Sequence, residues 1–131
     1  MNRENLQTVL YVDDEPDIRE VVELSLGLVG GLTVHTCESG ERALEVLPIL
    51  QPDLILLDVM MPRLDGPSTL QRLRADPRSA RIPVVFMTAK AMPQEVERFK
   101  QLGAVAVIAK PFDPMRLGEQ VISIWEGLTG E

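Results

Sequence analysis

The sequence is poor in the residues that form disulfides, zinc clusters and catalytic triads. Cys37 is the single cysteine and His35 the single histidine among 131 residues. One cysteine excludes an internal disulfide, and two such residues are too few for a Cys/His zinc site. No third group is marked to orient His35 and Cys37 as a triad. We therefore expect His35 to be a structural residue within a strand.

The chain also lacks a long apolar run and an excess of positive charge. No apolar stretch approaches the roughly 20 residues of a transmembrane helix, and the polar residues 1–5 predict no signal peptide. The formal net charge of −7 argues against direct binding to nucleic acid or an anionic membrane, which requires clustered Lys and Arg. We expect a cytoplasmic protein with a single domain over residues 1–131 and a core over about 8–128.

Five short apolar segments recur along the chain, and each is followed by a segment with helical spacing. Continuous apolar runs are typical of parallel strands that are covered on both faces. Their alternation with helices predicts βαβ crossovers, and hence an α/β fold with helices on both sides of a parallel sheet. The expected strands are residues 9–12, 32–36, 54–57, 84–87 and 105–108.

Prolines and glycines mark the ends of the expected helices. On the last helix, Ile122 and Trp125 are rotated away from the main apolar stripe, which leaves two interpretations open: a wide core face, or an exposed patch for a partner or for self-association. The helices are expected from Pro16 to Gly30, from about Ser39 to about Pro48, after Pro67, from Pro93 to Gly103, and from Pro114 onward.

Acidic residues follow two of the expected strands. Asp13 and Asp14 come directly after the first strand, and Asp58 follows the third. The carboxyl ends of parallel strands meet at one edge of the sheet, where ligands bind in such folds. Two carboxylates about 5 Å apart repel by roughly 3 kcal/mol at an effective dielectric near 20. A divalent cation would turn that repulsion into attraction, so the pattern predicts a metal site.

A hydroxyl and an ammonium group are expected at the same edge. Thr88 follows the fourth strand, and Lys110 follows the fifth. Carboxylates with a cation, a hydroxyl and an ammonium group are typical of phosphoryl transfer. The sequence has no nucleotide-binding glycine loop, so the phosphate must come from a donor other than bound ATP. A carboxylate can accept it as a mixed anhydride, and Asp58 is the best-placed nucleophile.

Five ordered blocks make the chain resemble the receiver domain of two-component response regulators, from about Thr8 to Leu128. The resemblance implies a flavodoxin-like, doubly wound (βα)5 fold with a five-stranded parallel sheet in the order 2-1-3-4-5. The blocks are VLYVDDEP at 9–16, PDLILLDVMMP at 52–62, LDG at 64–66, PVVFMTAK at 83–90 and AKPF at 109–112.

The resemblance also implies a magnesium site. Asp14 and Asp58 would bind Mg²⁺ directly, Asp13 would bind it through water, and the backbone carbonyl of Met60 would add a ligand. Gly66 would give the loop after Asp58 the backbone freedom that it needs.

A phosphorylation mechanism is implied by the same likeness. Asp58 would accept the phosphoryl group from a phosphohistidine on a histidine kinase or a histidine phosphotransfer protein. Thr88 would donate a hydrogen bond to the phosphate, Lys110 would pair with it, and the Lys110-Pro111 bond would be cis. The protein would catalyse only its own phosphorylation and dephosphorylation. It would signal to a downstream protein through the last two helices, and homodimer formation is left open.

The chain departs from the family pattern at three positions. Val107 stands where many receivers have Tyr or Phe, and a β-branched aliphatic cannot swing between buried and exposed orientations. We therefore expect activation to be transmitted through the backbone after Thr88 and the face of the last two helices. Met60 and Lys90 lie two residues past Asp58 and Thr88, beside the path that the hydrolytic water takes in this family. We expect both to slow or redirect that water.

Two other functions remain open. A metal-dependent phosphatase with an aspartyl-phosphate intermediate usually needs a second acid two residues after the nucleophile, where this chain has Met60. A receiver-like scaffold that is never phosphorylated would bind partners without using Asp58 or Lys110.

Overall fold

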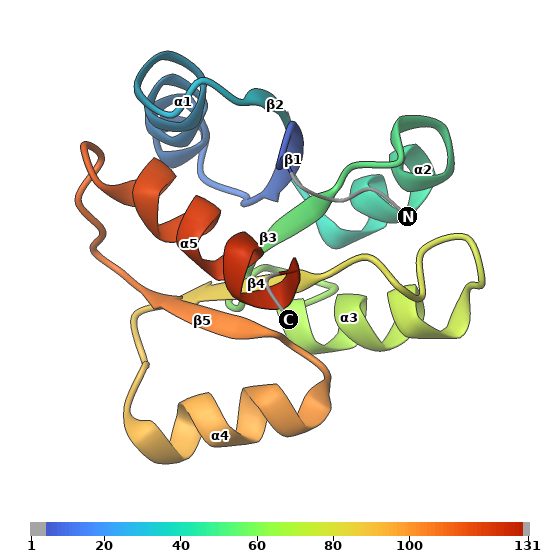
Figure 1. Cartoon of the computed structure of the whole chain (residues 1–131). Helices are drawn as coiled ribbons and strands as arrows, with labels where there is room; N and C mark the ends of the chain where they lie inside the picture. The colour runs from blue at the N-terminus through green and yellow to red at the C-terminus, as the bar shows by residue number, and fades with distance from the viewer. Residues whose placement is uncertain (1–4, 130–131) are drawn as a thin grey trace.

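The computed structural model describes residues 5–129, so residues 1–4 of the polar start lie outside the described part. Strands and helices alternate along the chain (Figure 1), as the apolar segments predicted. The elements are β1 (Thr8–Val12), α1 (Pro16–Leu24), the π-helix η1 (Ser25–Val29), β2 (Thr33–Cys37), α2 (Gly40–Leu50), β3 (Leu54–Asp58), α3 (Gly66–Ala75), β4 (Val84–Thr88), α4 (Pro93–Leu102), β5 (Ala106–Ala109) and α5 (Leu117–Thr129).

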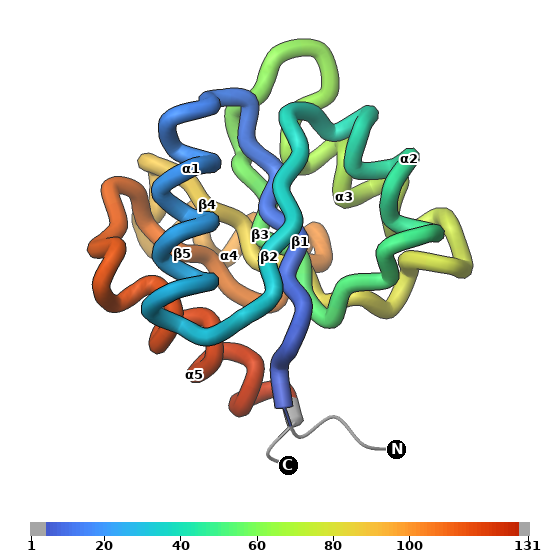
Figure 2. The backbone as a smooth tube through the Cα atoms, turned by 90° about the horizontal axis from the view of Figure 1, so that it is seen from above, coloured from blue at the N-terminus to red at the C-terminus, as the bar shows by residue number. Residues whose placement is uncertain are grey.

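The five strands form one parallel sheet in the order β2-β1-β3-β4-β5, which confirms the flavodoxin-like topology. Helices α1 and α5 cover one face of the sheet and α2, α3 and α4 cover the other (Figures 1 and 2). Every residue of β3 and β4 is buried, as expected of central strands covered on both faces. The strand β2 lies at the sheet edge, where burial alternates and His35 is exposed.

Two hydrophobic clusters fill the layers on either side of the sheet. Successive strand residues point to opposite faces, so each strand supplies both clusters. In β1, Val9 and Tyr11 belong to the cluster under α1 and α5, whereas Leu10 and Val12 belong to the cluster under α2, α3 and α4. Trp125 is 3% exposed and lies in the first cluster. The wide core face of the last helix is therefore confirmed, and Trp125 forms no exposed patch.

Three helix ends differ from those indicated by the sequence, and one of them is the start of α3 at Gly66, before Pro67. The helix α2 continues through Pro48 to Leu50 and ends where Gln51 adopts a φ of 50°. Pro48 therefore lies inside the helix, where it removes one backbone hydrogen bond. The last helix begins at Leu117 instead of Pro114, because residues 114–116 form a turn in which Arg116 donates to the Asp113 carbonyl. Among residues 5–129, no helix is long and apolar enough to cross a membrane.

Candidate functional site

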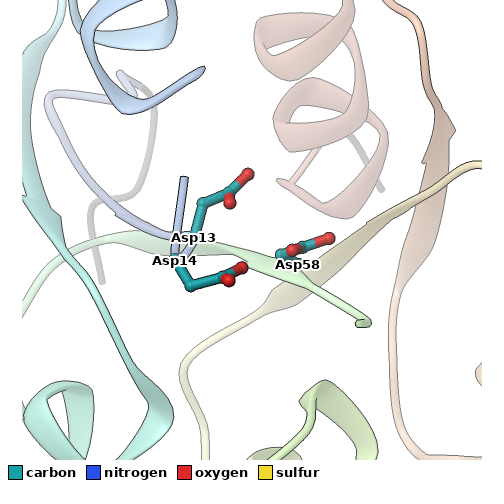
Figure 3. A group of neighbouring side chains, drawn as sticks. All are labelled: Asp13, Asp14 and Asp58. Carbon is teal, nitrogen blue, oxygen red and sulfur yellow. The ribbon is translucent and has the colours of Figure 1, made fainter. Parts of the chain in front are cut away.

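Three carboxylates meet at the carboxyl ends of β1 and β3. Asp13 and Asp14 follow β1, Asp58 ends β3, and one oxygen of each lies within 4.8 Å of the others (Figure 3). Asp13 is 0% exposed and Asp58 is 5% exposed, while Asp14 is the most accessible of the three. The sequence predicted this cluster from the acidic strand ends, and the structure brings all three residues together.

Lys110 links two of these carboxylates. Its Nζ lies 3.1 Å from Asp13 Oδ2 and 3.0 Å from Asp58 Oδ1. The lysine follows β5, and its peptide bond to Pro111 is cis, as the resemblance implied. The site holds three carboxylates and one ammonium group, so it keeps an excess of negative charge that suits a cation.

The alternation of side chains along the strands explains why these groups share one side of the sheet. Tyr11 and Leu56 point toward α1 and α5, so Asp13 and Asp58, two residues further along, emerge on the same side. Lys110 follows Ile108 of β5 in the same way. The site therefore lies at the carboxyl edge, directly beyond the hydrophobic layer under α1 and α5.

Burial and charge shift the protonation equilibria of the site. Burial raises the pKa of Asp58, the negative charge of Asp13 raises it further, and the hydrogen bond from Lys110 offsets part of the rise. For Lys110, burial lowers the pKa, but its contacts with Asp58 and Asp13 outweigh burial, and the net direction is upward. The lysine is therefore held as an ammonium ion at neutral pH.

Thr88 ends β4 beside the cluster and connects the ends of two strands. The register pairs Asp58 with Met87, so Thr88 lies one residue further along the neighbouring strand. Its hydroxyl accepts a hydrogen bond from the Lys90 backbone N–H at 3.0 Å, and its carbonyl accepts one from Lys110 N–H at 2.9 Å. Thr88 is buried, and the structure places it at the edge where the sequence predicted it.

The loop after Asp58 is held close to the strand by a glycine. A Cβ at Gly66 would lie 2.6 Å from the Asp58 carbonyl oxygen, and the Gly66 N–H donates to the Val59 carbonyl at 2.9 Å. Only glycine fits this approach, although its φ is not positive. The side chain of Met60, in the same loop, is 71% exposed.

The donor set fits magnesium. Carboxylate and carbonyl oxygens are the ligands that hard divalent cations prefer. Asp13, Asp14 and Asp58 supply such oxygens within 4.8 Å of one another, and the Met60 carbonyl follows Asp58 by two residues. The excess negative charge of the cluster also favours the binding of a divalent cation.

His35 and Cys37, which were set aside as catalytic candidates, do not contribute side chains to the carboxylate cluster. His35 is exposed on β2, and Cys37 is buried at the end of that strand. Burial raises the pKa of the Cys37 thiol to about 11, and the charge of Glu38 adds to the rise. The thiol is therefore protonated at neutral pH and is no thiolate nucleophile.

Tyr11 is a residue of the site that the sequence reasoning missed. Its hydroxyl donates to Asp13 Oδ2 at 2.5 Å, while the Glu15 backbone N–H donates to Asp13 Oδ1 at 2.9 Å. The sequence analysis counted Tyr11 only as part of an apolar run. The signal was its spacing of two residues before Asp13, which places both side chains on one face of the strand.

A hollow of about 380 Å³ opens beside Lys110, between α1 and the segment that follows β5. Its lining is mainly apolar, and Lys110 and Glu15 supply charge at its wall. The lining residues are Glu15, Ile18, Val21, Ala89, Lys110, Pro111, Phe112 and Pro114.

Comparisons with known proteins agree on one family. The family model described as "Response regulator receiver domain" matches residues 9–122. The chain is 40% identical over 110 residues to "Response regulator Rre1" of Synechocystis, covering 84% of this chain and 48% of that protein. It is 36% identical over 113 residues to a "Probable cyclic di-GMP phosphodiesterase" of Vibrio cholerae, covering 85% of this chain and 25% of that protein.

A solved structure supports the same grouping. The chemotaxis protein CheY4 of Vibrio cholerae superposes with a TM-score of 0.83 at 28% identity, covering 92% of this chain and 99% of that one. The chain thus spans about half or less of the two curated relatives named above, but nearly all of this structural neighbour.

Proposed function

The chain belongs to the response regulator receiver domain family, and we propose that it is a phosphoacceptor signalling module. Asp58 accepts a phosphoryl group in a Mg²⁺-dependent reaction, and the phosphorylated domain signals by contact with another protein. The observation that carries this proposal is the placement of Lys110, whose Nζ lies 3.1 Å from Asp13 and 3.0 Å from Asp58.

The proposed transfer is a displacement at phosphorus. An Asp58 carboxylate oxygen forms a bond to phosphorus while the P–N bond of a phosphohistidine breaks, and the electron pair stays on the imidazole nitrogen. Burial and the Asp13 charge raise the pKa of Asp58, which makes the carboxylate more basic than an exposed one. Lys110 keeps its charge and supplies a donor to the new phosphoryl oxygens.

The remaining site residues have supporting parts in this proposal. Mg²⁺, held directly by Asp14, Asp58 and the Met60 carbonyl and through water by Asp13, would neutralise charge on the phosphoryl oxygens. The Thr88 hydroxyl would exchange its contact with the Lys90 N–H for one with the phosphoryl group.

The donor in this proposal is a histidine kinase or a histidine phosphotransfer protein. The hollow beside Lys110 supports that assignment, because a side chain of the donor protein could bind in its apolar lining next to the phosphoacceptor. The formal charge of −7 does not favour nucleic acid as a direct partner.

For the output, we place the partner surface on the last two helices, α4 and α5. Val107 of β5 is partly buried and packs against the cluster under α2, α3 and α4. A packed β-branched side chain cannot act as a rotating switch. The signal would then pass through the backbone after Thr88, and phosphorylation should shift the amide resonances of residues 89–92 and α4. Shifts confined to another face would contradict this route.

Intact mass after incubation with Mg²⁺ and acetyl phosphate tests the proposed function. We expect one added phosphoryl group on the wild type, labile to hydroxylamine, and none on Asp58→Asn. Asp53→Asn is a matched control, because Asp53 is a carboxylate at the opposite end of β3 and should leave the modification intact. If the wild type gains no mass where a control receiver does, the phosphoacceptor assignment is wrong for this donor. A phosphohistidine donor then repeats the test.

A further inference from the structure

Tyr11 is a buried residue whose phenol hydroxyl contacts the site from the hydrophobic core. It lies in the middle of β1, is 0% exposed and belongs to the hydrophobic cluster under α1 and α5. Asp13 lies two residues further along on the same side of the strand, and it is also 0% exposed. A buried hydroxyl needs a hydrogen-bond partner, and a buried carboxylate needs several donors. The hydrogen bond between them therefore gives the buried phenol its partner and the buried carboxylate one of its donors.

The contacts of Asp13 divide between its two oxygens. The Glu15 backbone N–H donates to Oδ1 at 2.9 Å, and Tyr11 donates to Oδ2 at 2.5 Å. Lys110 Nζ lies 3.1 Å from that same Oδ2. The phenol and the ammonium group therefore share one carboxylate oxygen.

This sharing affects Asp58 through the lysine. Lys110 also donates to Asp58 Oδ1 at 3.0 Å, so the ammonium group is divided between two carboxylates. A second donor on Asp13 Oδ2 reduces the negative charge that this oxygen presents to Lys110. Without the phenol, a fully buried Asp13 would draw the lysine more strongly and away from Asp58.

We infer that Tyr11 is a positioning residue of the proposed phosphoacceptor site: its hydroxyl holds Asp13 in place and leaves Lys110 free for Asp58. The inference rests on the proposed function and adds to it the residue that orients the cluster from within the core. Burial raises the pKa of Tyr11 and its hydrogen bond to Asp13 raises it further, so the phenol is a permanent donor at neutral pH. Groups that orient a metal ligand in this way commonly change metal affinity when they are removed.

Tyr11→Phe is the decisive variant, because it removes the hydroxyl and keeps the ring in the core. Two quantities should be measured: the Mg²⁺ dissociation constant of the unphosphorylated protein by calorimetry, and the phosphorylation rate by acetyl phosphate at saturating Mg²⁺. We expect the dissociation constant to rise about tenfold and the rate to fall by a similar factor.

A control variant separates positioning from packing. Val9→Ala removes buried volume from the same face of β1, two residues before Tyr11. It should lower the melting temperature and leave Mg²⁺ affinity within about twofold of the wild type. If Tyr11→Phe also stays within about twofold of the wild type in affinity and rate, the inference is overturned. If the wild type itself neither binds Mg²⁺ nor accepts a phosphoryl group, the proposed function has failed instead.

Discussion

The two ends of the sheet differ in how their charged side chains are paired. At the amino end, Asp53 precedes β3 and accepts backbone N–H groups of Gln7 at 3.1 Å and Thr8 at 2.9 Å. Arg74, near the end of α3, donates to three backbone carbonyls that lie before β4 and β5. These are Ala80 at 3.2 Å, Ile82 at 2.9 Å and Gly103 at 3.2 Å.

At the carboxyl end, negative charges outnumber positive ones. Asp13 and Asp58 share the ammonium group of Lys110, Asp14 adds a third carboxylate to the cluster, and burial raises the pKa of Asp58. Charges that satisfy the backbone contribute stability, whereas clustered like charges cost stability until a ligand neutralises them. The charges at the amino end thus stabilise the fold, whereas the cluster at the carboxyl end keeps an excess of negative charge that suits the proposed metal site.

The largest expected effect lies at the amino end. Arg74→Met would leave three backbone carbonyls without their donor, so we expect the free energy of unfolding to fall by about 3 kcal/mol. Chemical denaturation measures this. Arg72→Met, on an exposed position of the same helix, should change stability by less than about 0.5 kcal/mol. If the two variants lowered the free energy of unfolding equally, the proposed structural role of Arg74 would be wrong.

Asp53→Ala should have the next largest effect. The N–H groups of Gln7 and Thr8 would lose their acceptor, and we expect a loss of about 1.5 kcal/mol in the free energy of unfolding. Glu45→Ala removes an exposed ion pair with Arg42 and should leave the free energy of unfolding nearly unchanged, because exposed ion pairs contribute little. If Asp53→Ala cost no more than Glu45→Ala, the contrast between the two ends would be broken.

Asp58→Asn should act in the opposite direction in metal-free protein. We expect it to raise the free energy of unfolding by roughly 1 kcal/mol at pH 7, because the burial of the Asp58 charge and its repulsion with Asp13 are only partly offset by Lys110. The pKa of Asp58 is raised in the folded state, so folding favours the protonated form. That contribution is present at low pH and is lost as the pH rises from about 3.9, the unfolded value, through the folded pKa.

Denaturation of both proteins between pH 3 and pH 8 checks this sign. The advantage of Asp58→Asn should vanish at the acid end of the range and grow toward neutral pH. A constant difference, or an advantage that grows toward acid, would show that the Asp58 charge is not the cause.

The smallest expected effects concern hydrolysis. Met60 and Lys90 are exposed beside the site and should leave stability unchanged when replaced. We expect Met60→Asn and Lys90→Glu each to speed dephosphorylation by about threefold, which corresponds to roughly 0.65 kcal/mol of barrier. Dephosphorylation rates can be followed by mass spectrometry. If both variants matched the wild type, Met60 and Lys90 would have no influence on the hydrolytic water.

Much of this contrast was readable from the sequence. The five apolar segments predicted the strands, and the acidic residues after two of them predicted the cluster at the carboxyl edge. Thr88 and Lys110 follow the fourth and fifth expected strands, and this order predicted that both lie at the same edge. These predictions were correct because the carboxyl ends of parallel strands lie at one edge of the sheet, and small differences in helix length do not change that.

The features that were missed depend on contacts between distant elements. Arg74 has no sequence signal, since its three acceptors are backbone carbonyls brought close only by folding. The π-helix after α1 packs against α5, where a Cβ at Gly118 would lie 3.0 Å from the Cα of Gly30. Tyr11 is different, because its spacing from Asp13 was visible and only the apolar character of the run concealed it.

The most direct test of the account is the response of three proteins to Mg²⁺. The melting temperatures of the wild type, Asp58→Asn and Asp53→Ala should each be measured with and without saturating Mg²⁺. Binding at about 100 times the dissociation constant adds roughly 2.7 kcal/mol. The account predicts that the wild type and Asp53→Ala rise by the same several degrees while Asp58→Asn barely responds. Equal rises in all three proteins, or none in the wild type, would contradict it.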